Sequence, residues 1–356
     1  MAEKLIYLFA LQMFAEAGTV TNTSTGTVNA YTGAATTTDA LSVENKIFYD
    51  TNTLDFYREK AVFAQLGKKQ VLPANAGRSV EVRKFDTLPD ADKLKEAVIP
   101  EGKVLSATAI TMPIDQYGLY VTVSDVLDMH AIDDVIVQAT ERVAYSASLT
   151  NEKLVRGVLM GNANVLFADI LNAEGVYQST PTSREELAAG KANVAYLTPK
   201  MINKAVTILK KANAPTYSGG KYVAVIHPSV AEDLRESKAW IEAHKYSQTT
   251  EIFNGEIGEL HGVRFVESNL APVVEEGGVA VYLTMFFGAD AFAVVDPQGA
   301  GMETIIKGRE QAGGPLNQFS TVGAKFSMGA GILYPERMVT LESLSSYSEI
   351  DEANAA

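Results

Sequence analysis

The sequence predicts an α+β protein whose centre is a compact module of alternating helices and strands. Three patterns support this class. Apolar residues recur at helical spacing over one long stretch, residues 133–160. Apolar and polar residues alternate, as they do in strands, at 80–85 and 321–334. Between 198 and 290, helical patterns and short apolar runs follow one another, within a chain of 356 residues that is long enough to bury a sizeable core.

The composition is that of an acidic globular protein. Hydrophobic residues make up 47% of the chain and charged residues 21%, which argues against bulk disorder. The formal net charge of −13 opposes adhesion to DNA or to an anionic membrane. Because the sequence contains no cysteine, it has neither a disulfide framework nor a thiolate metal site. Self-association must rest on apolar burial and locally matched charges, since salt screens charges beyond about 8 Å.

The first residues predict an apolar anchor that docks on protein. The run Leu5–Leu11 is far shorter than the about 20 residues that span a bilayer, so we expect no membrane partner. A cleaved signal peptide is the alternative, because 15–17 resembles a small-residue cleavage site. We favour docking, with Phe9 and Phe14 as candidate interface residues.

An extended arm and then a helix are expected next. Residues 18–38 carry no charge and are rich in threonine, so they cannot bury enough apolar surface to become ordered without a partner. We expect an arm that orders against a neighbour; a terminus without a role is the alternative. A helix is predicted from Ser42, a suitable N-cap, to Gly67, a suitable stop.

The next segment predicts a long β-hairpin. Strand-like alternation at 80–85 and at 104–112 flanks a charged stretch, 86–103, that would form the tip. The distal part has few large apolar residues, and a two-stranded hairpin is marginal in water unless it rests on something. It is either a solvated flap or an arm that lies over an adjacent subunit. The second interpretation makes five of its residues interface candidates: Arg83, Phe85, Lys93, Lys95 and Glu96.

The longest helix is predicted over 133–160, a length of about 40 Å at 1.5 Å per residue. Asp133 and Asp134 near its start, and Lys153 and Arg156 near its end, suit the helix dipole. Its apolar stripe needs a sheet or another helix to cover it.

The α/β module follows. Pro199 and Pro228 each begin a predicted helix, and 222–226 is an apolar run typical of a buried strand. The one tryptophan, Trp240, is expected to pack inside this module; an interface anchor is the alternative.

The remaining strands are predicted at 263–266, 279–287, 291–295, 302–307, 321–334 and 338–344. Glycine-rich stretches at 299–301, 313–314 and 329–331 are expected to form turns or bulges.

Sequence motifs give no support for catalysis, so we predict no catalytic, cofactor-binding or metal-binding residues. His227, His244 and His261 lie 17 residues apart, whereas a helical zinc pair is spaced by about four. The sequence has neither a phosphate-binding Gly-x4-Gly-Lys-Ser/Thr run nor a Gly-x-Ser-x-Gly elbow. Basic residues do not form the stripe that a nucleic-acid reader needs.

Four segments together resemble a known family. They are Tyr222-Val223-Ala224-Val225-Ile226-His227-Pro228, Ala231-Glu232-Asp233-Leu234-Arg235, the stretch 255–265, and Phe287-Gly288-Ala289-Asp290-Ala291-Phe292-Ala293. In this order the chain, from about residue 41 to 344, resembles the major capsid proteins of tailed, double-stranded DNA bacteriophages. Herpesvirus capsid proteins and encapsulins share that fold.

The resemblance implies a division of the chain. It assigns 1–67 to an N-terminal arm with its helix and 75–115 to an extended β-hairpin loop. Residues 116–189 and 291–345 would form a peripheral domain with a long spine helix and an antiparallel sheet. Residues 190–290 would form an α/β axial domain, and 346–356 a C-terminal tail.

The resemblance also implies a structural function in the virion. The chain would assemble with itself, as hexamers and pentamers, into an icosahedral phage head in the host cytoplasm. The head would enclose double-stranded DNA without sequence-specific contact. A portal and a separate scaffolding protein are expected partners, the latter because the N-terminus is short and uncharged. A nanocompartment shell of the encapsulin type is the alternative, and an α/β enzyme with a lid hairpin comes third.

Some relatives cross-link a loop lysine to an asparagine of a neighbour. Lys93, Lys95 and Lys103 lie in the loop here, but no catalytic carboxylate motif accompanies them, so we expect no cross-link.

Overall fold

The computed structural model describes residues 21–22, 62–73, 77–85, 88, 90–91, 93, 102–131, 135–172, 176–190, 194–237, 240, 258–297, 302–312 and 316–354. The chain forms two compact units, and each is described by itself. The first unit comprises Met1–Phe56, Tyr117–Ala147 and Met302–Phe326. The second unit comprises Tyr57–Gln116, Ser148–Gly301 and Ser327–Ala356.

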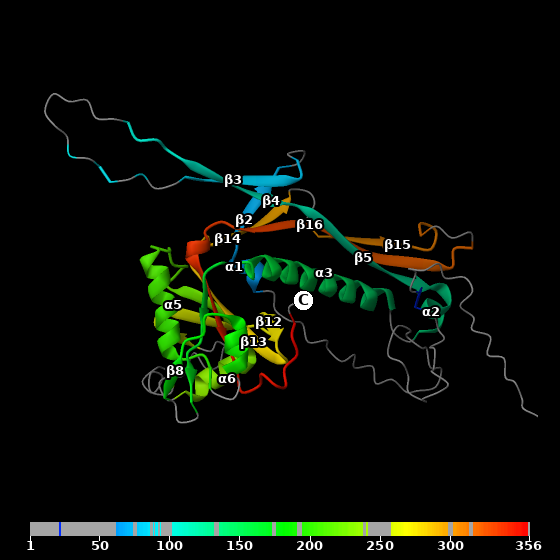
Figure 1. The fold of residues 1–356 in the computed structure, drawn as a ribbon. Helices are drawn as coiled ribbons and strands as arrows, with labels where there is room; N and C mark the ends of the chain where they lie inside the picture. The colour runs from blue at the N-terminus through cyan, green and yellow to red at the C-terminus, as the bar shows by residue number, and fades with distance from the viewer. Residues whose placement is uncertain are drawn as a thin grey trace, which may run out of the picture. The chain divides into compact units, whose positions relative to one another are not determined.

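A seven-stranded sheet forms the centre of the second unit (Figure 1). Its order is β10 (Glu259–Leu260), β11 (Val263–Glu267), β9 (Tyr222–Ile226), β13 (Val279–Phe287), β17 (Met338–Ser343) and β6 (Val165–Phe167), with β12 (Val273–Glu276) also paired to β13. Strand β11 is parallel to β9, whereas β13 is antiparallel to both β9 and β17. Every residue of β9, β13 and β17 is buried, as expected for strands whose two faces are both covered.

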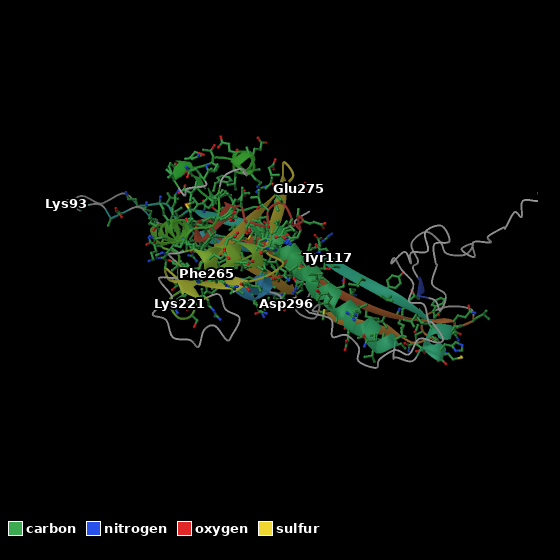
Figure 2. The ribbon with its side chains drawn as sticks, turned by 90° about the horizontal axis from the view of Figure 1, so that it is seen from below. Lys93, Tyr117, Lys221, Phe265, Glu275 and Asp296 are labelled. Atoms are coloured by element: carbon green, nitrogen blue, oxygen red, sulfur yellow. The ribbon has the colours of Figure 1, made fainter. Side chains whose placement is uncertain are left out.

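Three helices of the second unit are α4 (Arg184–Ala189), α5 (Pro199–Lys211) and α6 (Pro228–Glu236). Proline at the first position begins both α5 and α6, because it has no N–H that would need an intrahelical partner. The apolar face of α5 packs into the main core with sheet residues such as Phe265 and Phe286. Figure 2 shows Phe265 among these side chains.

The β-hairpin belongs to the second unit. Strands β3 (Ser79–Phe85) and β4 (Ala107–Pro113) pair antiparallel, from Ser79 opposite Pro113 to Phe85 opposite Ala107. Nearby, helix α1 (Phe63–Leu66) leads into β2 (Lys68–Leu72), which is parallel to β14 (Phe292–Pro297). The last residues of β16 (Phe319–Ile332) pair antiparallel with β14. A short antiparallel pair, β7 (Ile170–Leu171) with β8 (Tyr177–Ser179), and the 3-10 turn η3 (Pro335–Arg337) complete the set.

The first unit contains strand β5 (Asp115–Ser124) from residue 117 onward, helix α2 (Asp125–His130) and the start of α3 (Val135–Leu159). Strand β1 (Thr21–Asn22) is parallel to β5, and β15 (Glu303–Lys307) is antiparallel to β16. The hydroxyl of Ser124 accepts a hydrogen bond from the Leu127 N–H and so caps α2. Helix α3 and strands β5 and β16 each continue from one unit into the other.

Most predicted elements of the described residues are confirmed. Helix α3 matches the 133–160 prediction within two residues, and the hairpin, β9, β13, β17 and both proline-started helices lie where expected. Most of the helix predicted from Ser42, and most of the charged tip 86–103, lie outside the described residues. Among the described residues, no helix is long and apolar enough to cross a membrane.

Two expectations need correction. Residues 329–331 form neither a turn nor a bulge, because they lie inside β16 and pair in continuous register with residues 293–295 of β14. The second hairpin strand begins at Ala107, and the expected first residue, Val104, is 88% exposed.

Candidate intersubunit interface

The two faces of the β3–β4 hairpin differ in burial. Along β3, half-buried and exposed residues alternate strictly, because successive side chains of a strand point to opposite faces. Val80 and Val82 pack with buried Met112 of β4 against Leu333 and neighbouring apolar residues. The paired part of the hairpin, residues 79–84 with 108–113, is here called its root. One face of the root packs on the same protomer, and the other face is exposed.

Glycines allow this close packing. A Cβ atom at Gly331 would lie 2.4 Å from Cγ of Met112, and one at Gly329 would lie 2.4 Å from the carbonyl oxygen of Pro113. Both distances are too short for a real side chain, so glycine at these two positions lets β16 approach β4. Gly329 and Gly331, which were predicted to lie in a turn or bulge, instead allow β16 to pack closely against β4.

A cluster of charged and aromatic side chains fixes the root of the hairpin. Lys84 Nζ donates to Glu336 Oε1 at 2.5 Å and lies 4.8 Å from the ring centroid of Tyr334. The guanidinium of Arg337 lies 3.8 Å from the same ring. Tyr334 thus takes part in two cation–π contacts, an interaction that contributes about 0.5–1 kcal/mol at exposed sites.

The pKa of Glu336 is consistent with this contact. Burial opposes its ionisation, but hydrogen bonds from Lys84 and from the Glu336 backbone N–H, with the charges of Lys84 and Arg337, outweigh burial and lower the pKa below 4.5. A carboxylate with a lowered pKa stabilises the fold above its unfolded pKa, and this contribution is lost as pH falls through the lowered value. The ion pair therefore holds the hairpin root at neutral pH.

Beyond its root the hairpin exposes apolar side chains. The exposed fractions are 62% for Phe85, 56% for Leu88, 88% for Val104 and 57% for Leu105. Figure 2 shows Lys93 far out on this hairpin, away from the core residue Phe265. Exposed apolar residues gathered on one element are typical of a surface that another molecule covers.

The predicted interface residues have different environments. Phe9, Phe14, Lys95 and Glu96 lie outside the described residues. Phe85 and Lys93 are exposed on the hairpin. Arg83 is exposed too, and its Nε lies 3.3 Å from Glu81 Oε1 on the same strand, so its charge is partly matched within the hairpin.

Trp240 has a different position. It is 5% exposed in the main core, and its ring makes an edge contact with Phe265 at a centroid distance of 6.0 Å. In the isolated chain Trp240 is therefore a packing residue and is not presented to a partner.

Glu152 makes a buried structural contact that the sequence patterns did not predict. It lies on α3, is 1% exposed, and accepts backbone N–H bonds from Val62 and Phe63 at 2.5 Å each and from Ala64 at 3.1 Å. These N–H groups begin helix α1, where free donors and the helix dipole favour a negative charge. The carboxylate thus fixes residues 62–64, near the end of the segment 1–67 that was predicted to be the N-terminal arm with its helix.

A second missed contact joins α4 to the central sheet. Arg184 donates to both carboxylate oxygens of Glu342 on β17, at 2.5 and 2.8 Å. The hydrogen bond to Glu342 is the largest of the influences that raise the pKa of Arg184. The one charged residue in the strand Met338–Ser343, all of whose residues are buried, was the available signal for this pair.

His227 caps a helix. Its Nδ1 accepts a hydrogen bond from the Ser229 N–H at 3.3 Å, at the start of α6. Burial lowers the pKa of His227, an effect that the charge of Asp351 partly opposes. Within the described part of the chain, no group of three or more His, Asp or Glu side chains is arranged to hold a metal ion.

Comparison with known proteins identifies the family. A family model described as phage capsid protein matches residues 108–341, more than half of the chain. The chain belongs to the phage capsid protein family. This capsid protein is a structural component of the virion rather than an enzyme. No curated protein matches its sequence.

Solved phage capsids share its fold. The capsid of cyanophage P-SCSP1u is 14% identical with a TM-score of 0.62, over 85% of this chain and 93% of that one. The cyanophage Pam1 capsid is 13% identical with a TM-score of 0.61, over 87% and 99% of the two chains. The capsid of Ralstonia phage GP4 is 15% identical with a TM-score of 0.60, over 86% and 96%. The predicted capsid fold is confirmed.

Proposed function

We propose that this capsid protein assembles with itself into hexamers and pentamers of an icosahedral head that encloses double-stranded DNA. We further propose that the β3–β4 hairpin lies across a neighbouring copy in that shell. Assembly would take place in the host cytoplasm, with a scaffolding protein and a portal as partners. The net charge of −13 suits a wall that does not bind its genome tightly.

The observation that carries the proposal is the contrast along the hairpin. Near the root, Val82 and Lys84 are engaged with the protomer, whereas Phe85, Val104 and Leu105 are exposed. A two-stranded hairpin has too little burial to be stable in water without support. Covering its distal part with a second copy would supply that support.

We also propose the division of the chain that the family resemblance implies. The extended loop is 75–115, the axial domain 190–290, and the peripheral domain 116–189 with 291–345, between an arm at 1–67 and a tail at 346–356. The central sheet adds one qualification, because it joins β9, β11 and β13 of the proposed axial domain to β17 and β6, which lie outside 190–290.

Energetics allow each contact to be modest. A standard interface buries about 1,600 Å² in total, of which about 57% is apolar, so apolar burial contributes about 23 kcal/mol gross at about 25 cal/mol/Å². Orientation and ordering costs cancel much of this gain. A subunit in a closed shell makes several such contacts, so their sum can hold the shell together.

The direct test is negative-stain microscopy and size-exclusion chromatography of the purified protein, made with its scaffolding partner. We expect closed icosahedral particles, and particles from infected cells should contain double-stranded DNA. A monomer or dimer under every condition contradicts the shell. Particles that hold enzymes and no DNA would instead show the nanocompartment.

A further inference from the structure

The C-terminal segment 345–354, here called the strap, is fastened onto the second unit by side-chain hydrogen bonds. Oδ2 of Asp351 accepts from the Ser229 hydroxyl at 2.5 Å and from the Tyr282 hydroxyl at 2.6 Å. Ser229 is the second residue of α6 and Tyr282 lies within β13, so this carboxylate links the strap to a helix and to the central sheet.

Asn354 makes the most complete set of contacts. Its Oδ1 accepts from Arg156 Nη1 at 3.1 Å and from the Val273 N–H at 2.9 Å. Its Nδ2 donates to the carbonyl oxygens of Asn269 at 3.1 Å and Ala271 at 2.9 Å. Two donors and two acceptors therefore surround the carboxamide, which matches the hydrogen-bonding capacity of an asparagine side chain.

The backbone of Asn354 is held as well. Its carbonyl oxygen accepts from Arg156 Nη2 at 2.6 Å, and its N–H donates to the Val273 carbonyl oxygen at 3.1 Å. Recognition thus extends from the side chain to the peptide that carries it.

Arg156 provides the charged part of the site. It lies on α3, is 4% exposed, and also donates from Nη1 to the Leu270 carbonyl oxygen at 3.1 Å. A buried guanidinium is costly unless acceptors surround it. Asn354 supplies two of its acceptors, so removal of the strap would leave this cation less well satisfied.

We propose that Arg156 and the backbone of residues 269–273 form a binding site selective for an asparagine carboxamide, with the strap as its ligand. The docked strap ties the carboxyl end of α3 to the loop before β12. This inference goes beyond the proposed shell, because it concerns how each subunit holds its own C-terminal segment. Docking of the strap does not depend on whether the chain forms a shell, and the shell does not depend on whether the strap docks.

A hydrolytic role for the neighbouring polar residues is disfavoured by their bonding. Ser229, His227 and Asp351 are the residue types of a serine triad. However, the Ser229 hydroxyl is bonded to Asp351, and Nδ1 of His227 accepts from the Ser229 backbone N–H. A nucleophilic serine would need its hydroxyl bonded to the imidazole. These residues anchor the strap.

The first test uses the full chain and carboxypeptidase digestion followed by mass spectrometry. Rates are normalised to a free peptide of the same C-terminal sequence. We expect the wild type to stop after loss of Ala355 and Ala356, and N354A and N354D to lose Asp351 about tenfold faster or more, because each leaves buried polar groups unpaired. The control is E352Q, which changes an exposed neighbour and should behave as wild type.

N354D is the most informative variant. Aspartate has the same shape and keeps an acceptor for Arg156, but it places a second acceptor oxygen against the carbonyl oxygens of Asn269 and Ala271. Equal digestion of N354D and wild type would overturn the carboxamide selectivity. Equal digestion of N354A and wild type would overturn the site itself.

The second test measures binding in trans. A chain that ends at Glu349 is mixed with a fluorescent peptide of residues 350–356, and anisotropy gives the Kd. We expect the natural peptide to bind about tenfold tighter or more than peptides with Asp or Gln at position 354. Equal affinities contradict the proposal. Circular dichroism checks that the shortened chain is folded; if it is not, the digestion experiment decides.

Discussion

The central sheet and the β-hairpin of the second unit differ in where their apolar residues go. All nine residues of β13 are buried, and β9 and β17 on either side of it are buried throughout. In β3, by contrast, no residue is fully buried, and Phe85 at its end is 62% exposed. The sheet completes its core within one protomer, whereas the distal hairpin exposes surface that a single copy does not cover. The folding core and the proposed assembly surface therefore lie in separate regions of one unit.

The largest expected effect comes from removing the distal hairpin. Replacing residues 86–103 with Asn-Gly, which leaves a five-residue connection between Phe85 and its strand partner Ala107, should leave a folded subunit that builds no normal shells, because the core lies elsewhere. Circular dichroism melts should change little, while microscopy should show no regular particles. A glycine-serine loop of the original length serves as the control for length. Loss of folding in the shortened variant would show that the hairpin belongs to the core.

A matched pair of phenylalanines sharpens the same contrast. Phe286 of β13 is fully buried and makes an edge contact with Phe265 at a centroid distance of 6.3 Å. F286A should lower the free energy of unfolding by about 3–5 kcal/mol, measured by urea denaturation. F85A should change it by less than about 0.5 kcal/mol and reduce the yield of particles instead. The reverse outcome would assign Phe85 to the core.

Glu152 tests how the arm is fixed to the folded body. E152Q keeps one acceptor but turns an amide N–H group toward a backbone donor, so we expect a loss of about 1–3 kcal/mol of unfolding free energy. Hydrogen exchange at residues 62–64 should rise in parallel. K153Q, which changes the exposed next residue of α3, is the control. Unchanged exchange in E152Q would show that the three N–H groups have other acceptors.

The smallest expected effect is a pH dependence of the stability of the fold, caused by His227. Burial lowers the pKa of His227 below its ordinary 6.5. At acidic pH this residue is therefore protonated more fully in the unfolded chain than in the folded chain. This group therefore lowers stability as pH falls below about 6.5. H227N keeps an N-cap acceptor and should flatten the melting temperature between pH 7 and pH 5.

His261 provides the control for this experiment. It is exposed and has a positive φ of 53°, a conformation that asparagine tolerates. H261N should therefore leave the fold intact, so it controls for the change from histidine to asparagine itself. An equal flattening in H261N would assign the effect to another source than His227.

Sequence patterns predicted the elements whose burial is local. Apolar residues recurring at helical spacing over 133–160 predicted α3, and the apolar run 279–287 predicted the buried strand β13. The hairpin was predicted from strand-like alternation at 80–85 and at 104–112. Strand β2 was not predicted, because it begins with two lysines, Lys68 and Lys69, and lacks the apolar pattern of a buried strand. It lies at the edge of its sheet, where charged residues can remain in solvent.

The sequence by itself indicated a capsid protein through its resemblance to that family, and its patterns predicted a long helix, a β-hairpin and an α/β module. The tertiary structure decided which distant segments meet. Glu152 binds backbone 90 residues earlier, Arg156 binds Asn354 198 residues later, and β17 joins the sheet of β13 rather than a separate one. A periodic pattern predicts that one face of an element is buried, but it does not predict which element covers that face. The partner of a buried charged residue can be identified only from the folded structure.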